Sequence, residues 1–489
     1  MMKVFASSMF FILLCILHMS FSCSGQAAAS ISIAAPMEKA EQEALYSTIQ
    51  SFVGKWWNGS DLYPDPCGWT PIQGVSCDLS NGLWYVTSLD IGPVHDNSLN
   101  CAPNADFGPH LFALKHLKSL SFFNCFVSPH HLLTIPTDKW ESLADSLESL
   151  EFRSNPGLVG QIPATFGGLK NLQSLVLIQN GLSSKIPTDI GNLSNLKRLV
   201  LSQNQITGKI PDSLGSLSGL LILDLSRNLL SGPLPHTLGK LTSLLKLDLS
   251  SNQLAGSIQG ELRNLKNLTL LDLSRNRFSG GLTKSFQEMS SVEELVLSNN
   301  PVGGDIMSLN WQNLKCLLVL DLSNMSLTGG IPDSIAELKR LRFLGLNDNN
   351  LAGDIPPRIG ALPNISAIYL NGNYLTGELK FSELFYGKMG RRFGAWNNTN
   401  LCYPIELKST GHAPYGVKPC HQEATTLHEN ISDLDEKSNL GKGDLNHDSH
   451  PTVSLAFPSF ASNGLCLCYI FLCELFMIAL DFSLTRFAW

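Results

Sequence analysis

The sequence predicts an α/β solenoid, in which short units of one kind stack side by side. One phrase of about two dozen residues recurs from Leu147 to Leu375, its leucines keep one spacing, and an asparagine marks the same place in nearly every copy. The marking asparagines are Asn155, Asn180, Asn204, Asn228, Asn252, Asn276, Asn300, Asn349 and Asn373, and Met325 fills one slot. Seven of the nine steps are 24 residues and two are 25. A fixed period of this length indicates units that bury their apolar faces only against their neighbours.

One unit explains why each residue type stands where it does. Leu220, Leu223 and Leu225 are expected to point into the stack, and the alternation of the last two predicts a short strand. Asn228 follows where the chain turns inward, and its amide can bond backbone groups that the bend leaves unpaired. Leaving such buried groups without partners would cost about 1–3 kcal/mol each. Gly232 suits a backbone angle that side chains resist.

The outer side of most units is marked by an Ile-Pro or Leu-Pro pair, in which proline fixes an extended bend. The prolines of these pairs are Pro187, Pro211, Pro235, Pro332 and Pro356. The complete phrase, L-x-x-L-x-L-x-x-N-x-L-x-G-x-I-P, resembles the plant-specific leucine-rich repeat. That resemblance implies a leucine-rich-repeat horseshoe, which we place at residues 86–396.

Two segments ahead of the repeats differ from them. The first segment has Lys3, then an apolar run from Phe10 to Leu17, then small residues from Ser20 to Ala29. This order is typical of a secretory signal peptide, which we place at residues 1–26. Residues 27–85 combine helical spacing from Glu41 to Val53 with two cysteines. They resemble the amino-terminal cap of plant leucine-rich-repeat receptors, which implies a helix and a disulfide over the apolar end of the stack.

Two longer phrases lie between this cap and the regular array. Cys125 takes the place of the marking asparagine, and 30 residues separate it from Asn155. Together with the segments at residues 65–75 and 119–125, these insertions resemble the Piriformospora indica-insensitive receptor-like proteins of plants, over residues 40 to 420. The resemblance implies a role in the response of a plant to fungi or other microbes.

Beyond the array we expect a modified last turn, with Asn397 as its marking asparagine, and a carboxy-terminal cap at residues 397–420. Residues 421–460 are polar and predict a flexible stalk. Residues 461–489 form an apolar tail, in which the run from Leu465 to Leu480 is 16 residues long and shorter than the roughly 20 that span a bilayer. A membrane helix, a lipid-anchor signal and a buried tail helix therefore stay open, although the first two indicate membrane attachment.

Seven cysteines fall within the expected extracellular part. In an oxidising compartment, Cys67 is expected to pair with Cys77, and Cys402 with Cys420, because each pair flanks one end of the array. Cys101 and Cys125 are a third candidate pair, and Cys316 is left over. The sequence has no C-x-x-C pair with matching histidines outside the tail, so we expect no metal centre.

Composition and motifs argue against several classes of function. The net charge of −7 lacks the basic footprint of a protein that binds nucleic acid. The sequence has no G-x-S-x-G, no H-E-x-x-H and no glycine-rich phosphate loop, so we expect neither an enzyme nor a cofactor. It also lacks H-R-D, and fewer than 70 residues follow Cys420, so we expect no kinase.

Seven N-x-S/T sequons predict glycans on a secreted chain. They are Asn58, Asn192, Asn267, Asn324, Asn364, Asn397 and Asn430. We expect Asn192, Asn267 and Asn364 in corresponding parts of their units, on the outer or lateral side, which would leave the inner face bare. Asn397 would instead be buried in the ladder.

Binding is therefore expected on the concave sheet, where the exposed strand positions differ from unit to unit. The candidate contact residues are Arg153, Gln173, Arg198, Arg227, Arg275, Glu293, Arg342, Phe343 and Tyr369. Arginine, phenylalanine and tyrosine are common at contact surfaces. The recurring aspartates Asp224, Asp248, Asp272 and Asp321, each followed two residues later by serine, look like framework.

Taken together, these features predict a non-enzymatic receptor-like protein at the plasma membrane. It would bind a protein, peptide or glycan on the extracellular side and signal through a co-receptor such as a receptor kinase. A wall-localised inhibitor of microbial polygalacturonases is the alternative, because its repeats look similar. An adaptor that scaffolds other receptors is a third.

Overall fold

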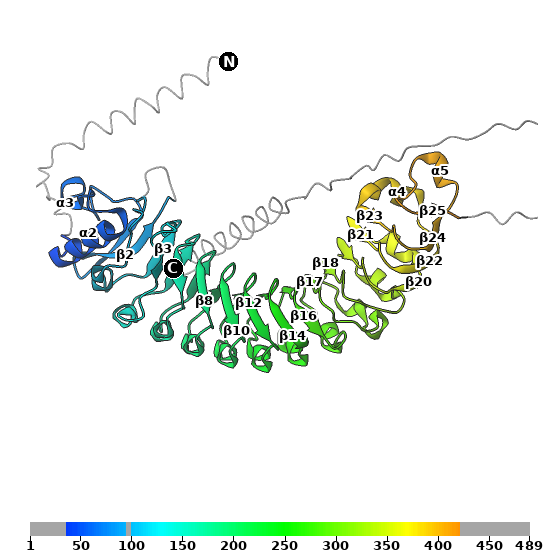
Figure 1. Cartoon of the computed structure of the whole chain (residues 1–489), viewed down its shortest axis with the longest axis horizontal. Coiled ribbons are helices and arrows are strands. Elements are labelled where there is room, and N and C mark those ends of the chain that lie inside the picture. The colour runs from blue at the N-terminus through cyan, green and yellow to red at the C-terminus, as the bar shows by residue number, and fades with distance from the viewer. Residues whose placement is uncertain (1–35, 94–98, 421–489) are drawn as a thin grey trace, which may run out of the picture. The chain divides into compact units, whose positions relative to one another are not determined.

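Short parallel strands, one from each unit, form the inner wall of an arc (Figure 1). The computed structural model describes residues 36–93 and 99–420. The inner sheet has 14 strands, and only β1 and β2 pair antiparallel. In spatial order the strands are β1 (Val75–Ser80), β2 (Leu83–Ile91), β3 (Ser119–Phe123), β5 (Ser149–Arg153), β7 (Ser174–Ile178), β9 (Arg198–Val200), β11 (Ile222–Asp224), β13 (Lys246–Asp248), β15 (Leu270–Asp272), β17 (Glu294–Val296), β18 (Val319–Asp321), β19 (Phe343–Gly345), β21 (Ala367–Tyr369) and β23 (Phe393–Gly394).

Two further parallel sheets lie lateral to the inner one. The first runs in the order β16 (Arg277–Ser279), β14 (Gln253–Ser257), β12 (Leu229–Gly232), β10 (Gln205–Gly208), β8 (Gly181–Ser184), β6 (Leu158–Gly160) and β4 (Leu133–Thr134). The second consists of β20 (Ala352–Asp354), β22 (Tyr374–Glu378), β24 (Asn400–Tyr403) and β25 (Lys418–Pro419). Neither lateral sheet takes a strand from the units of Asn300 and Met325. On the lateral side these two units are joined by an isolated bridge between Asp305 and Thr328, while the inner sheet continues.

The outer side carries short 3-10 turns, and each of them leads back to an inner strand. They are η1 (Pro109–Ala113), η2 (Trp140–Leu143), η3 (Ala164–Gly168), η4 (Thr188–Asn192), η5 (Asp212–Ser216), η6 (His236–Lys240), η7 (Gly260–Asn264), η8 (Lys284–Glu288), η9 (Ile306–Ser308), η10 (Trp311–Asn313), η11 (Asp333–Glu337) and η12 (Pro357–Ala361), with η13 (Gly390–Arg392) near the last inner strand. Pro187, Pro211 and Pro235 stand directly before such turns in extended conformation. The predicted leucine-rich-repeat solenoid is thus confirmed.

The core is a column of stacked leucines. The marking asparagines of successive units form a hydrogen-bonded ladder beside it. Asn252 is typical of the ladder: its Nδ2 donates to the carbonyls of Leu225, Leu249 and Ser250 at 3.0–3.2 Å. Its Oδ1 accepts from the N–H of Leu230 in the preceding unit at 3.1 Å. Each ladder amide therefore joins two units and satisfies backbone groups that the inward bend removes from other partners.

The position of Asn397 in the ladder was predicted wrongly. Asn398, one residue later, donates to the carbonyls of Leu370 and Ala395 and accepts from the N–H of Leu375. Asn397 is exposed and has a φ of 55°. It occupies the left-handed position that directly precedes the ladder residue in nearly every unit, so its side chain turns away from the stack.

Both ends of the stack are covered, as expected from residues 27–85 and 397–420. At the amino end, α2 (Lys39–Val53) buries Leu45, Ile49 and Phe52 against the first strands, and α3 (Gly59–Leu62) follows it. At the carboxy end, α4 (Glu383–Met389) and α5 (Leu407–Thr410) complete the cover. Glu41 of α2 accepts from the N–H of Val86 at 3.2 Å, and burial raises the pKa of its carboxyl.

Three disulfides hold these ends. Cys67 pairs with Cys77 and Cys402 pairs with Cys420, so the disulfide-bonded caps are confirmed. The third candidate pair, Cys101 with Cys125, is also bonded, and Cys316 is a free thiol. The Cys101–Cys125 bond ties the first insertion to a residue that takes a ladder slot.

Four expectations fall outside the described residues: the signal peptide at 1–26, the stalk at 421–460, the tail at 461–489 and the sequon at Asn430. Within residues 36–93 and 99–420, no helix is both long and apolar enough to span a bilayer.

Candidate ligand-binding face

The inner face of the sheet presents side chains in straight rows, because the strands pair in register. In the unit of β11, Leu223 and Leu225 are buried, while Ile222 and Asp224 point to the concave side. Ile222 pairs with Arg198 on one side and with Lys246 on the other, and every unit repeats this pairing. We define the inner face by the positions that correspond to Leu221, Ile222, Asp224, Ser226 and Arg227.

All nine candidate contact residues lie on this inner face. Arg198 and Phe343 occupy the row of Ile222, Tyr369 that of Asp224, and Arg153 that of Ser226. Arg227 and Arg275 share a row, and Gln173, Glu293 and Arg342 stand directly before their strands. The structure spreads them along the arc and does not gather them into one pocket. A partner that contacts most of them would therefore have to lie along the sheet.

Several of these side chains already have partners within the protein. Arg153 pairs with Glu151 on the same strand. Gln173 donates to Glu148 at 3.3 Å. Glu293 lies 3.5 Å from the guanidinium of Arg340. Phe343 and Tyr369 contact each other with ring centroids 5.9 Å apart.

Arg227 and Arg275 have a backbone role that sequence reasoning missed. Both have a φ of 54°, in the left-handed region that residues other than glycine rarely adopt. The corresponding residues of other units, such as Gln203 at 59° and Asp348 at 57°, do the same. The sequence did carry a signal of this left-handed conformation. Every one of these positions directly precedes a ladder residue, and none holds a β-branched side chain.

An acidic row crosses the middle of the inner face. Asp224, Asp248 and Asp272 pair strand by strand, so their carboxylates are neighbours. Burial, then the charges of Asp224 and Asp272, raise the pKa of Asp248 to about 7. Lys246 lies 3.5 Å from Asp224 and 3.8 Å from Asp248, and its charge opposes this shift without cancelling it.

The framework role expected for these aspartates agrees with their contacts. Both the N–H and the hydroxyl of Ser250 donate to Oδ1 of Asp248, at 3.1 and 2.7 Å. Ser226 contacts Asp224 in the same way, so the motif repeats. The expectation overlooked that carboxylates stacked one strand apart also repel each other. The 24-residue recurrence of aspartate in neighbouring strands was the available signal for this repulsion.

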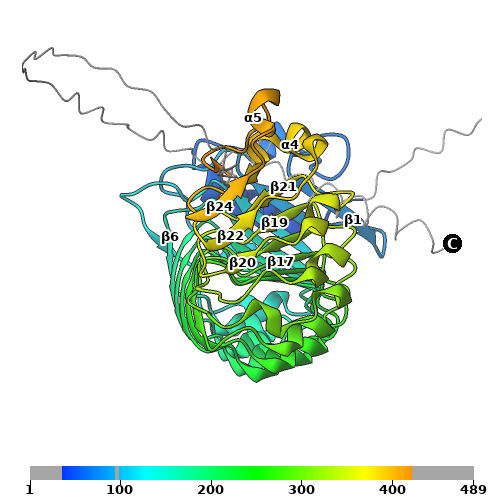
Figure 2. The same ribbon diagram turned by 90° about the vertical axis from the view of Figure 1, so that its right-hand side faces the viewer.

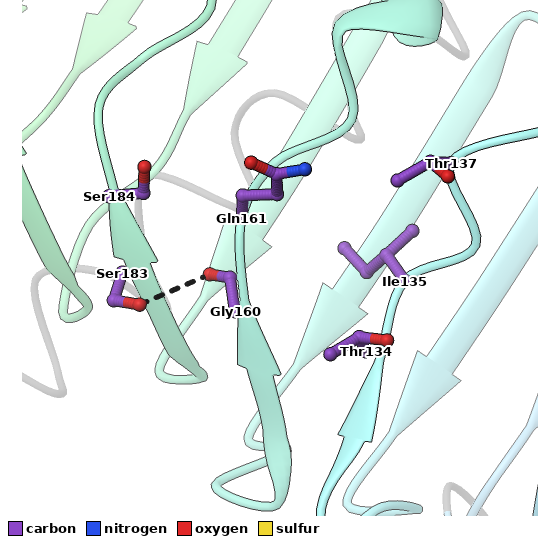
Figure 3. Close-up of a pocket in the computed structure, with 7 residues that line it drawn as sticks. All are labelled: Thr134, Ile135, Thr137, Gly160, Gln161, Ser183 and Ser184. Atoms are coloured by element: carbon purple, nitrogen blue, oxygen red, sulfur yellow. Dashed lines mark hydrogen bonds between the residues drawn. The ribbon is translucent and has the colours of Figure 1, made fainter.

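Two shallow hollows lie away from the inner face. One, of about 410 Å³, opens on the lateral sheet formed by β4, β6 and β8, where the hydroxyl of Ser183 donates to the carbonyl of Gly160 at 3.4 Å (Figure 3). Its lining is Thr134, Ile135, Thr137, Gly160, Gln161, Ser183 and Ser184. The other, of about 450 Å³, lies among the outer turns around η8, η9 and η11. Neither includes a candidate contact residue or an aromatic ring.

The sequons do not all lie on the outer or lateral side. Asn324 is exposed in the same row as Arg227, and its amide donates to Asn299 in the preceding unit at 3.0 Å. Asn397 takes the same position nearer the carboxy end. Asn267 and Asn364 do correspond, each in the turn before an inner strand, where each amide donates to the preceding unit. Asn192 differs from them, because it ends η4 three residues earlier in its unit.

Comparison with known proteins supports the assignment of the fold. Residues 116–311 match the family described as a leucine-rich repeat region, and residues 316–338 match the leucine-rich repeat family. The chain is 67% identical over 420 residues to Piriformospora indica-insensitive protein 2 of Arabidopsis thaliana, which covers 84% of this chain and 99% of that protein.

Two solved structures are similar to the chain. The crystal structure of PEPR1-AtPEP1 has 28% sequence identity and a TM-score of 0.59, covering 77% of this chain and 54% of that one. The plant peptide hormone receptor RGFR1 in complex with RGF2 has 31% identity and a TM-score of 0.54, covering 61% of this chain and 46% of that one. The chain therefore spans about half of either structure.

Proposed function

The chain belongs to the family of plant leucine-rich-repeat receptor-like proteins that includes Piriformospora indica-insensitive protein 2, and we propose that it acts at the cell surface as a receptor without a kinase. It binds a peptide, protein or glycan during the response of a plant to microbes, and it signals through a co-receptor. The likeness along almost the whole length of that relative carries this proposal.

The inner face supplies the binding surface. The ladder amides fix the backbone from unit to unit, so the rows of side chains on the inner face are held in place before a partner binds. Preorganisation of this kind lowers the entropic cost of association. The peptide hormone receptor among the similar structures carries a bound partner, which supports a peptide or protein as the ligand.

Transmission of the signal then depends on another protein. The sequence contains no H-R-D motif, so this chain would not phosphorylate a target itself. A receptor kinase that binds the loaded ectodomain would supply that step. Because the sequence has no G-x-S-x-G, no H-E-x-x-H and no glycine-rich phosphate loop, we infer that the protein is not an enzyme.

The proposal is tested on the full-length protein, tagged and expressed in leaves treated with fungal wall extract. Receptor kinases that co-purify are quantified for the wild type and for the double variant Arg227→Glu, Arg275→Glu. The variant should lose most of the elicitor-dependent kinase, because both side chains are exposed on the inner face. Arg263→Glu, exposed on η7 at the outer side, is the matched control. Equal recovery from all three proteins would refute the proposal.

Attachment to the membrane through residues 461–489 is a separate part of the proposal. Treating membranes with phosphatidylinositol-specific phospholipase distinguishes the ways of anchoring. Release of the protein would indicate a lipid anchor, and retention would favour a helix. A wholly soluble protein would favour the alternative function, a polygalacturonase inhibitor of the cell wall. That alternative predicts direct inhibition of a fungal polygalacturonase by the purified protein.

A further inference from the structure

Four aromatic rings meet at the carboxy-terminal end of the inner face. Phe343 and Tyr369 lie on neighbouring strands, and Trp396 and Tyr415 contact each other with ring centroids 6.0 Å apart. Figure 2 shows β19 beside β21 at this end of the sheet, and β18 separates β19 from β17. The two ring pairs form one surface, because both Tyr369 and Trp396 adjoin Gly394. We call these four residues the aromatic shelf.

Glycine makes the shelf possible. A Cβ added at Gly394 would stand 2.8 Å from the Trp396 ring and 2.9 Å from the Tyr369 ring. On the other side of Tyr369, its strand partner is Gly345. Tyr369 is therefore flanked along its row by two residues without side chains, and this leaves the ring accessible from the concave side. Tyr415, which is 76% exposed, extends the shelf into the cap.

The polar groups around the shelf differ from those in the middle of the sheet. The aspartate of the middle units is replaced by glycine at Gly345 and Gly394, and the serine by the amides of Asn347 and Asn371. The acidic row therefore ends where the aromatic shelf begins. Amides beside partly exposed rings suit a ligand that offers both hydroxyl groups and apolar faces.

Two arginines border the shelf. Arg342 and Arg391 take the same position before their strands, two strands apart, which corresponds to about 10 Å. Both are exposed, and among the residues that the structure describes neither has a carboxylate within 4.0 Å. They can therefore pair with negative charges on a bound molecule.

From this combination we propose that the aromatic shelf, with Arg342 and Arg391, is a subsite for an oligosaccharide that carries carboxylates. The sugar rings stack their C–H faces on the electron-rich aromatic faces, while the carboxylates contact the two guanidinium groups. A peptide usually places an anchor side chain in a pocket, and neither of the two hollows described above adjoins the shelf. A surface of aromatic rings instead fits a chain of sugar rings that present their C–H faces. This inference rests on the proposed receptor function, since it names the ligand of the same face.

The first test measures binding of an oligogalacturonate of defined length to the full-length protein by calorimetry. Tyr369→Ala should weaken binding about 10-fold, the equivalent of one lost stacking contact. Tyr369→Phe should retain it, because the ring is kept. Tyr374→Ala is the matched control, since Tyr374 is 62% exposed on β22 of the lateral sheet. Equal binding by the two alanine variants would overturn the proposal.

The second test separates charge from stacking. Arg342→Gln and Arg391→Gln should each weaken binding about 3-fold, and added salt should reduce that difference. Arg277→Gln, exposed on β16 of the lateral sheet, should change nothing. The fully methyl-esterified oligosaccharide should bind less tightly than the acidic one.

Several outcomes would overturn the inference while leaving the receptor proposal intact. They are the absence of oligogalacturonate binding, equal binding of the esterified form, and an acidic peptide that binds in its place with the same dependence on Tyr369. In each case the recruitment of a receptor kinase, and its loss in the Arg227 and Arg275 variant, would still decide the receptor function independently.

Discussion

Replacing Asp248 with asparagine should make the stability of the protein less sensitive to pH. Asp248 lies in the middle of the acidic row, with Asp224 and Asp272 one strand away on either side. Its side chain is only 17% exposed. Burial and the two neighbouring charges raise its pKa from 3.8 to about 7, although Lys246 and Ser250 act in the opposite direction.

The sign follows from comparing the folded and unfolded chains. Because the folded pKa is the higher one, the folded protein binds this proton more tightly than the unfolded chain does. The resulting stabilisation is fully present below about pH 4 and is lost as the pH rises through about 7. A difference of this size corresponds to at most about 4 kcal/mol. A single substitution should recover part of this difference, about 1–3 kcal/mol at pH 8.

Asparagine is suited to this test because it keeps the local hydrogen bonds. Its Oδ1 can still accept from the N–H and hydroxyl of Ser250, but it cannot ionise. Thermal unfolding of the full-length protein is followed by circular dichroism between about pH 4 and pH 8. The variant and the wild type should melt together at pH 4, and the variant should melt several degrees higher at pH 8.

The control is Asp138→Asn, which changes an exposed carboxylate ahead of η2. Its melting temperature should follow that of the wild type at every pH. The electrostatic reasoning would be wrong if Asp248→Asn also followed the wild type throughout. It would be equally wrong if the variant were the less stable protein at pH 8.

Three further predictions concern the ladder, the glycans and the shelf. Asn252→Ala should lower the free energy of unfolding by about 2–4 kcal/mol in urea titrations, because one buried N–H and several carbonyls lose their partner. Asn397→Gln should increase the gel mobility of the secreted protein and remove one glycosidase-sensitive step, since Asn397 is exposed. Asn397→Asp should give the same increase in mobility without altering the stability of the protein. Gly394→Ala should destabilise the protein by about 1–3 kcal/mol in the same urea titrations, because the new methyl group would strike the rings of Tyr369 and Trp396.

The regular part of the fold could be predicted because its cause is local and repeated. Leucine at fixed spacing gives the buried column, and an asparagine at the bend supplies the amide that the bend needs. The misplacement of Asn397 shows where spacing stops being sufficient. Two asparagines stand together there, and steps of both 24 and 25 residues occur in the array. A residue in the left-handed conformation precedes each ladder asparagine. Asn397 has that conformation, so Asn398 is the ladder residue.

The arrangement of the candidate site could be predicted only in part. Phe343 and Tyr369 could be recognised from the sequence, because each stands at an exposed position of a strand. Trp396 and Tyr415 belong to the last turn and the cap, and no repeat spacing relates them to the sheet. Their place beside Tyr369 depends on how the cap packs against β23, and that packing is non-local.

The distribution of charge along the inner face links the acidic row to the aromatic shelf. An acidic ligand that lies on the shelf and extends toward β15 approaches Asp272 and Glu294, and burial raises the pKa of both carboxyls. As the pH falls, Asp272 and Glu294 take up protons before ordinary carboxyls do, and Asp248 does so from about pH 7, so the repulsion of an acidic ligand falls. Binding of a long oligogalacturonate should therefore strengthen as the pH is lowered from 8 toward 5, and Asp248→Asn should reduce that dependence. A short oligosaccharide confined to the shelf should show neither effect, because it does not reach the acidic row.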